Sequence, residues 1–352
     1  NSDLPTLAGL ESLETVGGLF IQTNADLTDF TGLAALKSIG GEVMILDNPK
    51  LHTMAAMSAL ETIGGNTWIK GNAALQNLNG FNLLTTLSGS MTVQENHALT
   101  NMQGFESLKT VDGDFKILDE GGLINLIGLD ALETVGGHLI VQETKALTSL
   151  QGLTNLVTVS GDLGISDTTV LPNLTGLAGL KTIGSWLSIR NNTGLENLSG
   201  MSSLESVGVS LKISDNPLLT NLIGLETLTS VGLHVWVENN DKLLDMIGLH
   251  NMVAGGSITV ADNPELLNLE GLTMTHIPGY LHISNNDKIE TMIGLVTLES
   301  VTGTLYIAHN DGLLGLQGIE TLQSVGTLTI QFNSALPTCA AVALQEQITI
   351  TG

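Results

Sequence analysis

The sequence predicts an all-β solenoid in which about 14 coils of 23–24 residues stack on one another, with a short helical cap at the C-terminus. The first observation is an internal repeat, I-x-x-N-x-x-L, whose Asn recurs every 24 residues between Asn24 and Asn240 and every 23 or 24 residues afterwards. A fixed period of this length is typical of repeat architectures. The second observation is that aromatic residues make up only 3% of the chain, while Gly occurs 41 times. A core with few large rings suits a narrow and regular cross-section.

Each coil carries apolar residues at a spacing that fits no single regular element. In the coil that starts at Asn24, residues 27, 30, 33, 36 and 39 are apolar, and Val43 and Ile45 follow them. A spacing of three is neither the 3.6 of a helix nor the 2 of a strand, so it predicts a chain that bends repeatedly around a small core. Val43 and Ile45 alternate as in a short strand, and the pair Gly40 and Gly41 supplies the turn before it. Stacking buries the apolar side that one coil cannot bury alone.

Polar residues also recur at fixed positions of the coil. The Asn of the repeat forms one column, which Glu120, Thr144 and Thr168 interrupt, and a Ser/Thr column lies just before the Gly pairs. Stacked Asn amides can donate and accept hydrogen bonds between coils, and Thr hydroxyls can bond to turn backbone. We therefore expect both columns to be structural.

The domain organisation follows from where the repeat stops. Residues 1–336 are predicted to form one solenoid domain and residues 337–352 a C-terminal cap, with a short helix over residues 335–347 and a short strand over 348–351. Cys339 is the single cysteine, so an internal disulfide is not expected. No matching cap precedes Asn1. Because an open end exposes strand edges, we expect a further cap, another domain or another copy to cover it.

Charge and motifs exclude several classes of function. The chain has 35 acidic and 11 basic residues, a net charge of −24 at pH 7, and its basic residues are scattered, so binding to nucleic acid is not expected. Gly, Asn or a charge breaks every apolar run, so direct membrane insertion is not expected either. The sequence contains no HExxH, Gly-x-Ser-x-Gly elbow or phosphate-binding loop, and we predict no catalytic residues and no enzyme activity.

The repeat resembles that of the receptor L-domain family, whose members are leucine-rich-repeat-like proteins of cell surfaces. Residues 135–141 (VGGHLIV) and 39–48 (IGGEVMILDN) carry the resemblance, which extends over about residues 1–336. It implies a right-handed β-helix and an extracellular or cell-surface location. Receptor L domains are shorter and disulfide-capped, whereas this chain has one Cys, so growth-factor binding is not transferred to it.

Acidic residues form a column at the position before the Asn of the coil. Its members are Asp47, Glu95, Asp119, Glu143, Asp167, Asp215 and Asp262. Like charges on neighbouring strands repel one another, and the Asn column breaks in the same region. Ca²⁺ is bound by several closely spaced oxygen ligands. We therefore predict a candidate calcium site, and no other cofactor. Its ligands would be Glu95, Asp119, Glu120, Glu143 and Asp167. A solvated acidic edge is the alternative.

The outward side of the predicted strand carries large apolar residues. They are Phe20, Met44, Leu46, Trp68, Trp236 and Tyr306, of which the first four lie on adjacent coils. A contiguous exposed apolar patch with Trp usually marks an interface, so we predict an interaction surface here. Surface apolar residues without a partner are the alternative.

The sequence therefore predicts a non-catalytic extracellular or cell-surface scaffold that binds a protein or a glycan through one face of the solenoid. A self-assembling subunit of an extracellular fibre or surface layer, which binds copies of itself, is a second hypothesis. A carbohydrate-active β-helix enzyme is a third.

Overall fold

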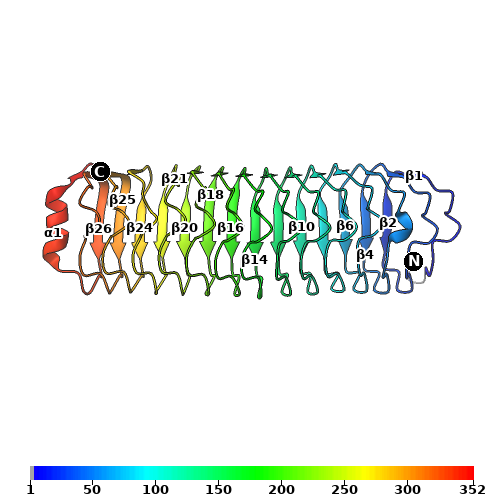
Figure 1. Ribbon diagram of the computed structural model, residues 1–352, viewed down its shortest axis with the longest axis horizontal. Helices are drawn as coiled ribbons and strands as arrows, with labels where there is room; N and C mark the ends of the chain where they lie inside the picture. Colours follow the sequence, from blue (N-terminus) through cyan, green and yellow to red (C-terminus); the bar gives the residue numbers. More distant parts are fainter. Residues whose placement is uncertain (1–3) are drawn as a thin grey trace. The chain divides into compact units, whose positions relative to one another are not determined.

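The computed structural model describes residues 4–352 and confirms the predicted fold class, a β-solenoid of about 14 coils with parallel sheets, 27% strand and a short C-terminal helix. The coils group into two compact units, one that ends at Ile183 (unit 1) and one that begins at Gly184 (unit 2). Within each unit the longer strands lie side by side (Figure 1). The described residues include no helix that is long and apolar enough to cross a membrane. That residues 1–336 form a single domain stays a prediction.

In unit 1, shorter and longer strands alternate along the chain. The longer strands are β2 (Leu19–Gln22), β4 (Val43–Leu46), β6 (Thr67–Lys70), β8 (Met91–Gln94), β10 (Phe115–Leu118), β12 (Leu139–Gln142) and β14 (Leu163–Ser166). The shorter strands are β1 (Thr15–Val16), β3 (Ser38–Ile39), β5 (Thr62–Ile63), β7 (Thr86–Leu87), β9 (Thr110–Val111), β11 (Thr134–Val135), β13 (Thr158–Val159) and β15 (Thr182–Ile183). A single turn of 3₁₀ helix, η1 (Ala55–Met57), also occurs in this unit.

Unit 2 continues the same alternation and then changes it near the C-terminus. The longer strands are β16 (Trp186–Arg190), β18 (Ser210–Ser214), β20 (Val235–Glu238), β22 (Ile258–Ala261) and β24 (Leu281–Ser284). The shorter strands are β17 (Ser206–Val207), β19 (Ser230–Val231), β21 (Val253–Ala254) and β23 (His276–Ile277). In the last two coils the two strands merge into β25 (Ser300–Ala308) and β26 (Ser324–Gln331).

The constant period sets the register of the sheets. Phe115 pairs with Met91 on one side and with Leu139 on the other, in parallel strands. All three side chains are 0% exposed, because the same inward position of each coil is apolar. The few aromatic core residues gather in unit 1, where the Phe105 ring lies 5.6 Å from that of Phe81 and 6.4 Å from that of Phe115. The predicted inward pattern is therefore the core.

The Ser/Thr column is part of a second parallel sheet that the sequence did not predict. Thr134 pairs with Thr110 and Thr158, while the next residue, Val135, is buried in the core. Strands of two residues are too short to show alternation along the sequence. The column is structural, as predicted, although it is a sheet and not a row of turns.

A Gly at one position of the coil, replaced by Ala56 in a single coil of the described chain, allows the neighbouring coil to approach closely. Gly152 has φ +116°, and a Cβ atom there would lie 1.9 Å from the backbone oxygen of Leu126 in the preceding coil. Both the positive φ and the missing Cβ are therefore required at this position. The same geometry recurs at Gly176, where a Cβ would lie 2.2 Å from Leu150 O.

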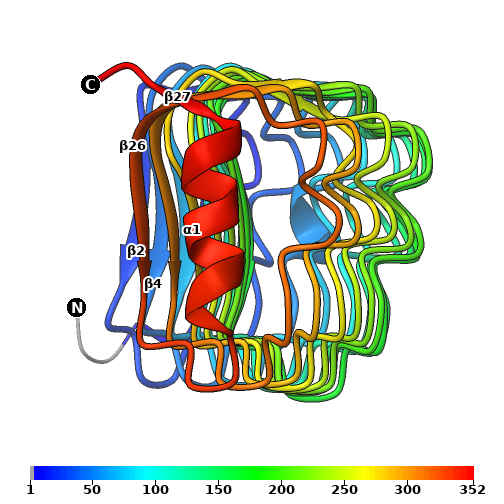
Figure 2. The same ribbon diagram turned by 90° about the vertical axis from the view of Figure 1, so that its left-hand side faces the viewer.

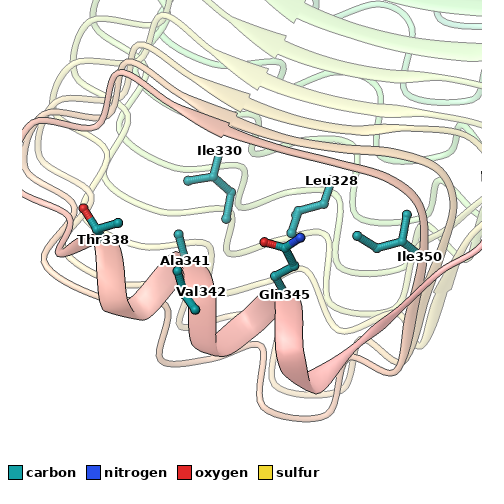
Figure 3. Close-up of a pocket in the computed structure, with 7 residues that line it drawn as sticks. All are labelled: Leu328, Ile330, Thr338, Ala341, Val342, Gln345 and Ile350. Carbon is teal, nitrogen blue, oxygen red and sulfur yellow. The ribbon is translucent and has the colours of Figure 1, made fainter.

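The C-terminal cap agrees with the prediction. Helix α1 (Thr338–Gln347) begins after Pro337 and lies across the end of the last coil, as Figure 2 shows. Leu344 and Ile348 are buried there, and β27 (Thr349–Ile350) pairs with β26. The packing is incomplete, because a cavity of about 220 Å³ separates α1 from Leu328 and Ile330 of β26 (Figure 3).

Candidate functional site

The acidic column has a backbone origin. Every non-glycine residue with positive φ in the described part of the chain lies at this one position, directly before the residue of the Asn column. These residues, with φ between 50° and 60°, are Thr23, Asp47, Glu95, Asp119, Glu143, Asp167, Asn191, Asp215, Asn239, Asp262, Asn285, His309 and Phe332. Asn and Asp tolerate the left-handed conformation better than other non-glycine residues. The position therefore selects Asp and Asn for backbone reasons, and Gly71 (φ 69°) fills it in one coil.

The residues predicted to bind calcium do not converge on one point. Among residues 4–352, no group of three or more His, Cys, Asp or Glu side chains is placed to hold a metal ion. Glu95 forms an ion pair with Lys70 at 3.2 Å and accepts a bond from Gln94 Nε2 at 2.7 Å. Asp119, Glu143 and Asp167 belong to the left-handed column, while Glu120 is 0% exposed inside the coil. The geometry therefore gives the calcium hypothesis no support.

The Asn column forms a buried ladder of hydrogen bonds. Asn48 Oδ1 accepts from the backbone N–H of Asn24 at 3.1 Å and from its Nδ2 at 3.0 Å. Asn48 Nδ2 donates in turn to Ile21 O at 3.0 Å and to Leu46 O at 3.1 Å. The same pattern recurs in unit 2, for example at Asn263. Each Asn thus satisfies backbone groups at the end of a strand and joins two coils, as predicted.

Glu120 is the exception in this ladder. Its two carboxyl oxygens accept the backbone N–H of Asn96, each at 3.0 Å, and Oε1 accepts Asn96 Nδ2 at 2.9 Å. Burial raises the pKa of Glu120 to about 7; the bonds from Asn96 oppose the rise, and the carboxylates of Asp119 and Glu95 add to it. On the next coil, the buried Thr144 hydroxyl has no hydrogen-bond partner in the described structure. Because Glu120 is enclosed, its place is in the core and not in a surface site.

The outward face of the longer strands in unit 1 brings the predicted apolar residues together. Phe20 of β2 pairs with Met44 of β4, which pairs with Trp68 of β6. Leu46 lies two residues along β4, on the same face. Phe20 is 58% exposed, and the other three side chains are half-buried. These four residues form one patch, the N-terminal patch.

In unit 2, aromatic and His rings lie on the outward face of the longer strands, around the predicted residues Trp236 and Tyr306. Trp236 stacks on Trp186, with ring centroids 5.4 Å apart and planes 7° apart, and its ring lies 5.1 Å from that of His234. Tyr306 lies 4.5 Å from His282. Thr259 pairs with both Trp236 and His282, and so separates the two ring groups by one strand. We call Trp186, His234, Trp236, His282 and Tyr306 the aromatic row.

Polar groups support the aromatic row. Nδ1 of His234 accepts the backbone N–H of Ser257 at 3.1 Å, which places the proton of the neutral ring on Nε2. Burial lowers the pKa of His282, and the carboxylates of Glu238 and Asp262 act in the opposite direction. Lys212, which pairs with Trp236 across the sheet, forms an ion pair with Glu238 at 3.2 Å. The surface therefore combines rings with fixed hydrogen-bonding groups.

Sequence reasoning missed Trp186 and His234. Both lie two residues before the outward position that contains Trp236: Trp186 is the first residue of β16, and His234 directly precedes β20. The signal was available, because alternate residues of a strand share a face, and a third outward position should have been included. The interaction surface is consequently wider than predicted.

Comparisons with known protein families and curated proteins identify no relative of this chain. No family model matches the chain, and a search of curated proteins finds no match.

Proposed function

We propose that this chain is a non-catalytic scaffold that binds a protein or a glycan through the outward face of its longer strands. One observation carries the proposal: all three Trp residues lie on this face, as Trp68 in unit 1 and as Trp186 and Trp236 in unit 2, and Tyr306 lies there as well. Four of the six Phe residues, in contrast, are fully buried in the core.

The chemistry of Trp and Tyr explains why this distribution supports binding. Each of these side chains has a large apolar ring and a polar group that keeps its hydrogen-bonding capacity, so both are enriched where a surface meets a partner. The core does not require them, because Leu, Ile, Val and Phe fill it. Their restriction to one face thus favours recognition over packing.

The proposal includes a setting. A solenoid fold, the VGGHLIV-type repeat and an acidic surface together favour a receptor-L-domain-like protein at a cell surface or outside the cell. In that setting, the regular strand face of each unit offers a partner many weak contacts that add up over neighbouring coils.

The experiment compares the wild-type chain with Trp68→Thr and Trp236→Thr. Thr is already present at the equivalent outward position, as Thr92 and Thr259, so both variants are expected to fold. Purified proteins are tested against immobilised glycans and a panel of extracellular proteins. We expect at least one ligand whose binding weakens about tenfold or more in one variant, the effect typical of losing an aromatic anchor. Ligands that bind all three proteins equally would contradict the proposal.

A second candidate function is self-association through the N-terminal patch, and the 58% exposure of Phe20 favours it. Among residues 4–352, β2 is the first strand of its sheet, and exposed aromatic side chains on such a strand promote pairing between copies. Analytical ultracentrifugation tests it: association that Phe20→Thr abolishes supports assembly, and a wild-type chain that stays monomeric at high concentration rejects it.

A further inference from the structure

Unit 2 carries a second apolar surface, away from the outward face of its sheet. It consists of six exposed aliphatic residues at the fourth and seventh positions after the ladder Asn. With exposed fractions of 39–59%, they are Ile223, Leu244, Ile247, Leu267, Ile293 and Leu314, which we call the aliphatic stripe. Leu267 N–H donates to Leu244 O, and Leu222 N–H donates to Ile247 O, so these positions lie next to one another on successive coils.

The fold does not require aliphatic residues at these positions. The fourth position in unit 1 is occupied by Thr28, His52, Gln76, Thr100 and Thr148, and the seventh by Thr31, Asn79, Gln103, Gln151 and Thr175. Ala55, Ile124, Ile127 and Pro172 are the apolar residues found there. The same backbone accepts polar side chains in unit 1, and also in unit 2 at Thr220, Glu270 and Glu290, so the exposed Leu and Ile residues of unit 2 need a reason other than folding. A contiguous exposed apolar patch is most often an interaction site.

A surface pocket lies beside the aliphatic stripe. A surface pocket of about 510 Å³ is lined by Thr220, Asp241, Lys242, Leu244 and Glu265. Leu244 thus belongs to both the stripe and the pocket wall. An inserted side chain would contact Leu244 and the side chains of Asp241, Glu265 and Lys242.

Acidic residues border the stripe. Asp241, Asp245, Glu265, Glu270 and Glu290 all lie between or beside its members. Burial raises the pKa of Asp245, the N–H of Ile247 opposes the rise, and the Glu270 carboxylate adds to it. Lys288, one of the two basic side chains there, already pairs with Glu265 at 2.6 Å. The residues that border the stripe therefore have a net negative charge, which basic side chains of a partner would neutralise.

The negative charge around the aliphatic stripe favours some binding partners over others. A second copy of a chain with a net charge of −24 would bring carboxylates against carboxylates, and an anionic membrane would be repelled in the same way. A partner that places basic residues beside aliphatic ones suits both features of the surface. The spacing suits a helix laid along the stack, which advances about 5.4 Å per turn where neighbouring coils lie about 4.8 Å apart.

We propose that the aliphatic stripe of unit 2 is a docking site for a cationic amphipathic helix of a partner protein. Its aliphatic face packs on Leu244, Ile247 and Leu267, and its Lys or Arg side chains reach the acidic border. This mode of recognition is the helix-in-groove type. It is independent of the aromatic row, which lies on a different surface.

The test uses the full chain and a synthetic helical peptide of about 18 residues with Leu along one face and Lys on both flanks. A peptide of the same composition in scrambled order and one with Glu in place of Lys serve as controls. The variant is Leu244→Thr with Leu267→Thr, which introduces the residue already present at Thr100 and Thr148, and its melting temperature verifies that it folds. The matched control is Ile124→Thr in unit 1, an exposed aliphatic residue at the same coil position.

We expect the amphipathic peptide to bind the wild-type chain and the Ile124→Thr control equally. The double variant should bind it at least about tenfold more weakly, because two central anchors are lost. Binding should also weaken with added salt. Absence of binding, equal binding of the scrambled peptide, or an unchanged double variant would each overturn the proposal. Trp236→Thr should leave this affinity unchanged, which separates the stripe from the proposed aromatic surface.

Discussion

Asn96 donates its backbone N–H to both carboxyl oxygens of Glu120 at 3.0 Å and its side-chain amide to Oε1 at 2.9 Å. One coil earlier, the acceptor in the same place is the neutral amide oxygen of Asn96, which Asn72 reaches at 3.1 Å. Glu120 therefore puts a titratable group where the repeat otherwise has an uncharged one. The substitution preserves the acceptor of the ladder and makes its stability depend on pH.

Glu120 should make the protein less stable as the pH rises. The pKa of this carboxyl is about 7 in the folded state, against a reference value of 4.5, so the folded state holds the proton more tightly. The contribution is complete below pH 4.5, is lost as the pH rises through 7, and amounts to about 3 kcal/mol. Urea unfolding between pH 4 and 8.5, compared with Glu120→Gln, measures it. A variant with the same pH dependence as the wild type would contradict the prediction.

Removal of a ladder Asn should destabilise the chain more than removal of an exposed one. Asn263→Ala leaves the backbone N–H of Asn240 without its acceptor, removes one of the three acceptors of Asn240 Nδ2, and removes the bonds from Asn263 Nδ2 to Val237 O and Ala261 O. Buried groups without partners cost about 1–3 kcal/mol each, so the free energy of unfolding should fall by about 3 kcal/mol or more. Asn251→Ala, which removes one exposed bond to Glu226 O, is the control and should change it by less than about 1 kcal/mol. Equal effects would refute a structural role for the ladder.

Substitutions at two glycines should distinguish the cost of backbone strain from the cost of steric overlap between coils. Gly9 (φ +103°) has nothing within 4 Å of an added Cβ, whereas at Gly152 (φ +116°) that atom would lie 1.9 Å from Leu126 O. Gly9→Ala should therefore cost only the backbone strain, about 1–3 kcal/mol. Gly152→Ala adds a clash between coils and should cost clearly more. Thermal melts of the two variants compare them, and a Gly152→Ala variant as stable as Gly9→Ala would show that the coils can separate freely.

The left-handed position before the ladder should prefer Gly to Glu. Glu143 has φ 57°, so Glu143→Gly is expected to raise the free energy of unfolding by about 1 kcal/mol. Gln142→Gly, one residue earlier in β12, should lower it, because Gly weakens a strand. Chemical denaturation of both variants checks the opposite signs. If Glu143→Gly were destabilising, the acidic column would need an explanation other than backbone conformation.

The inward pattern was predictable because stacking repeats it in every coil. Leu27 and Val43 have equivalents throughout the chain, so their spacing indicates the fold without any three-dimensional information. Glu120 was expected at the surface, since the sequence does not reveal which side of the chain an isolated Glu faces. The carboxylates of Asp119 and Asp167 were interpreted as metal ligands, because the sequence does not show that the backbone at their position has a positive φ.

The surfaces were predictable only in part. Trp68 and Trp236 occupy the position that the strand alternation marks as outward, whereas Trp186 lies at the edge of the strand and was overlooked. Leu244 and Ile247 occupy positions treated as spacers between inward leucines. That Leu244 and Ile247 are not required for folding becomes clear only from the structure, because unit 1 has polar residues at the equivalent positions.

Acrylamide quenching of indole fluorescence tests the central claim most directly, since all three Trp residues lie on the proposed binding face. In complex with a glycan or protein recovered by the binding screen, the quenching constant should fall, because the partner covers partly exposed rings such as Trp186 (37% exposed when free). A saturated complex whose tryptophans are quenched as readily as in the free chain would show that the partner binds elsewhere.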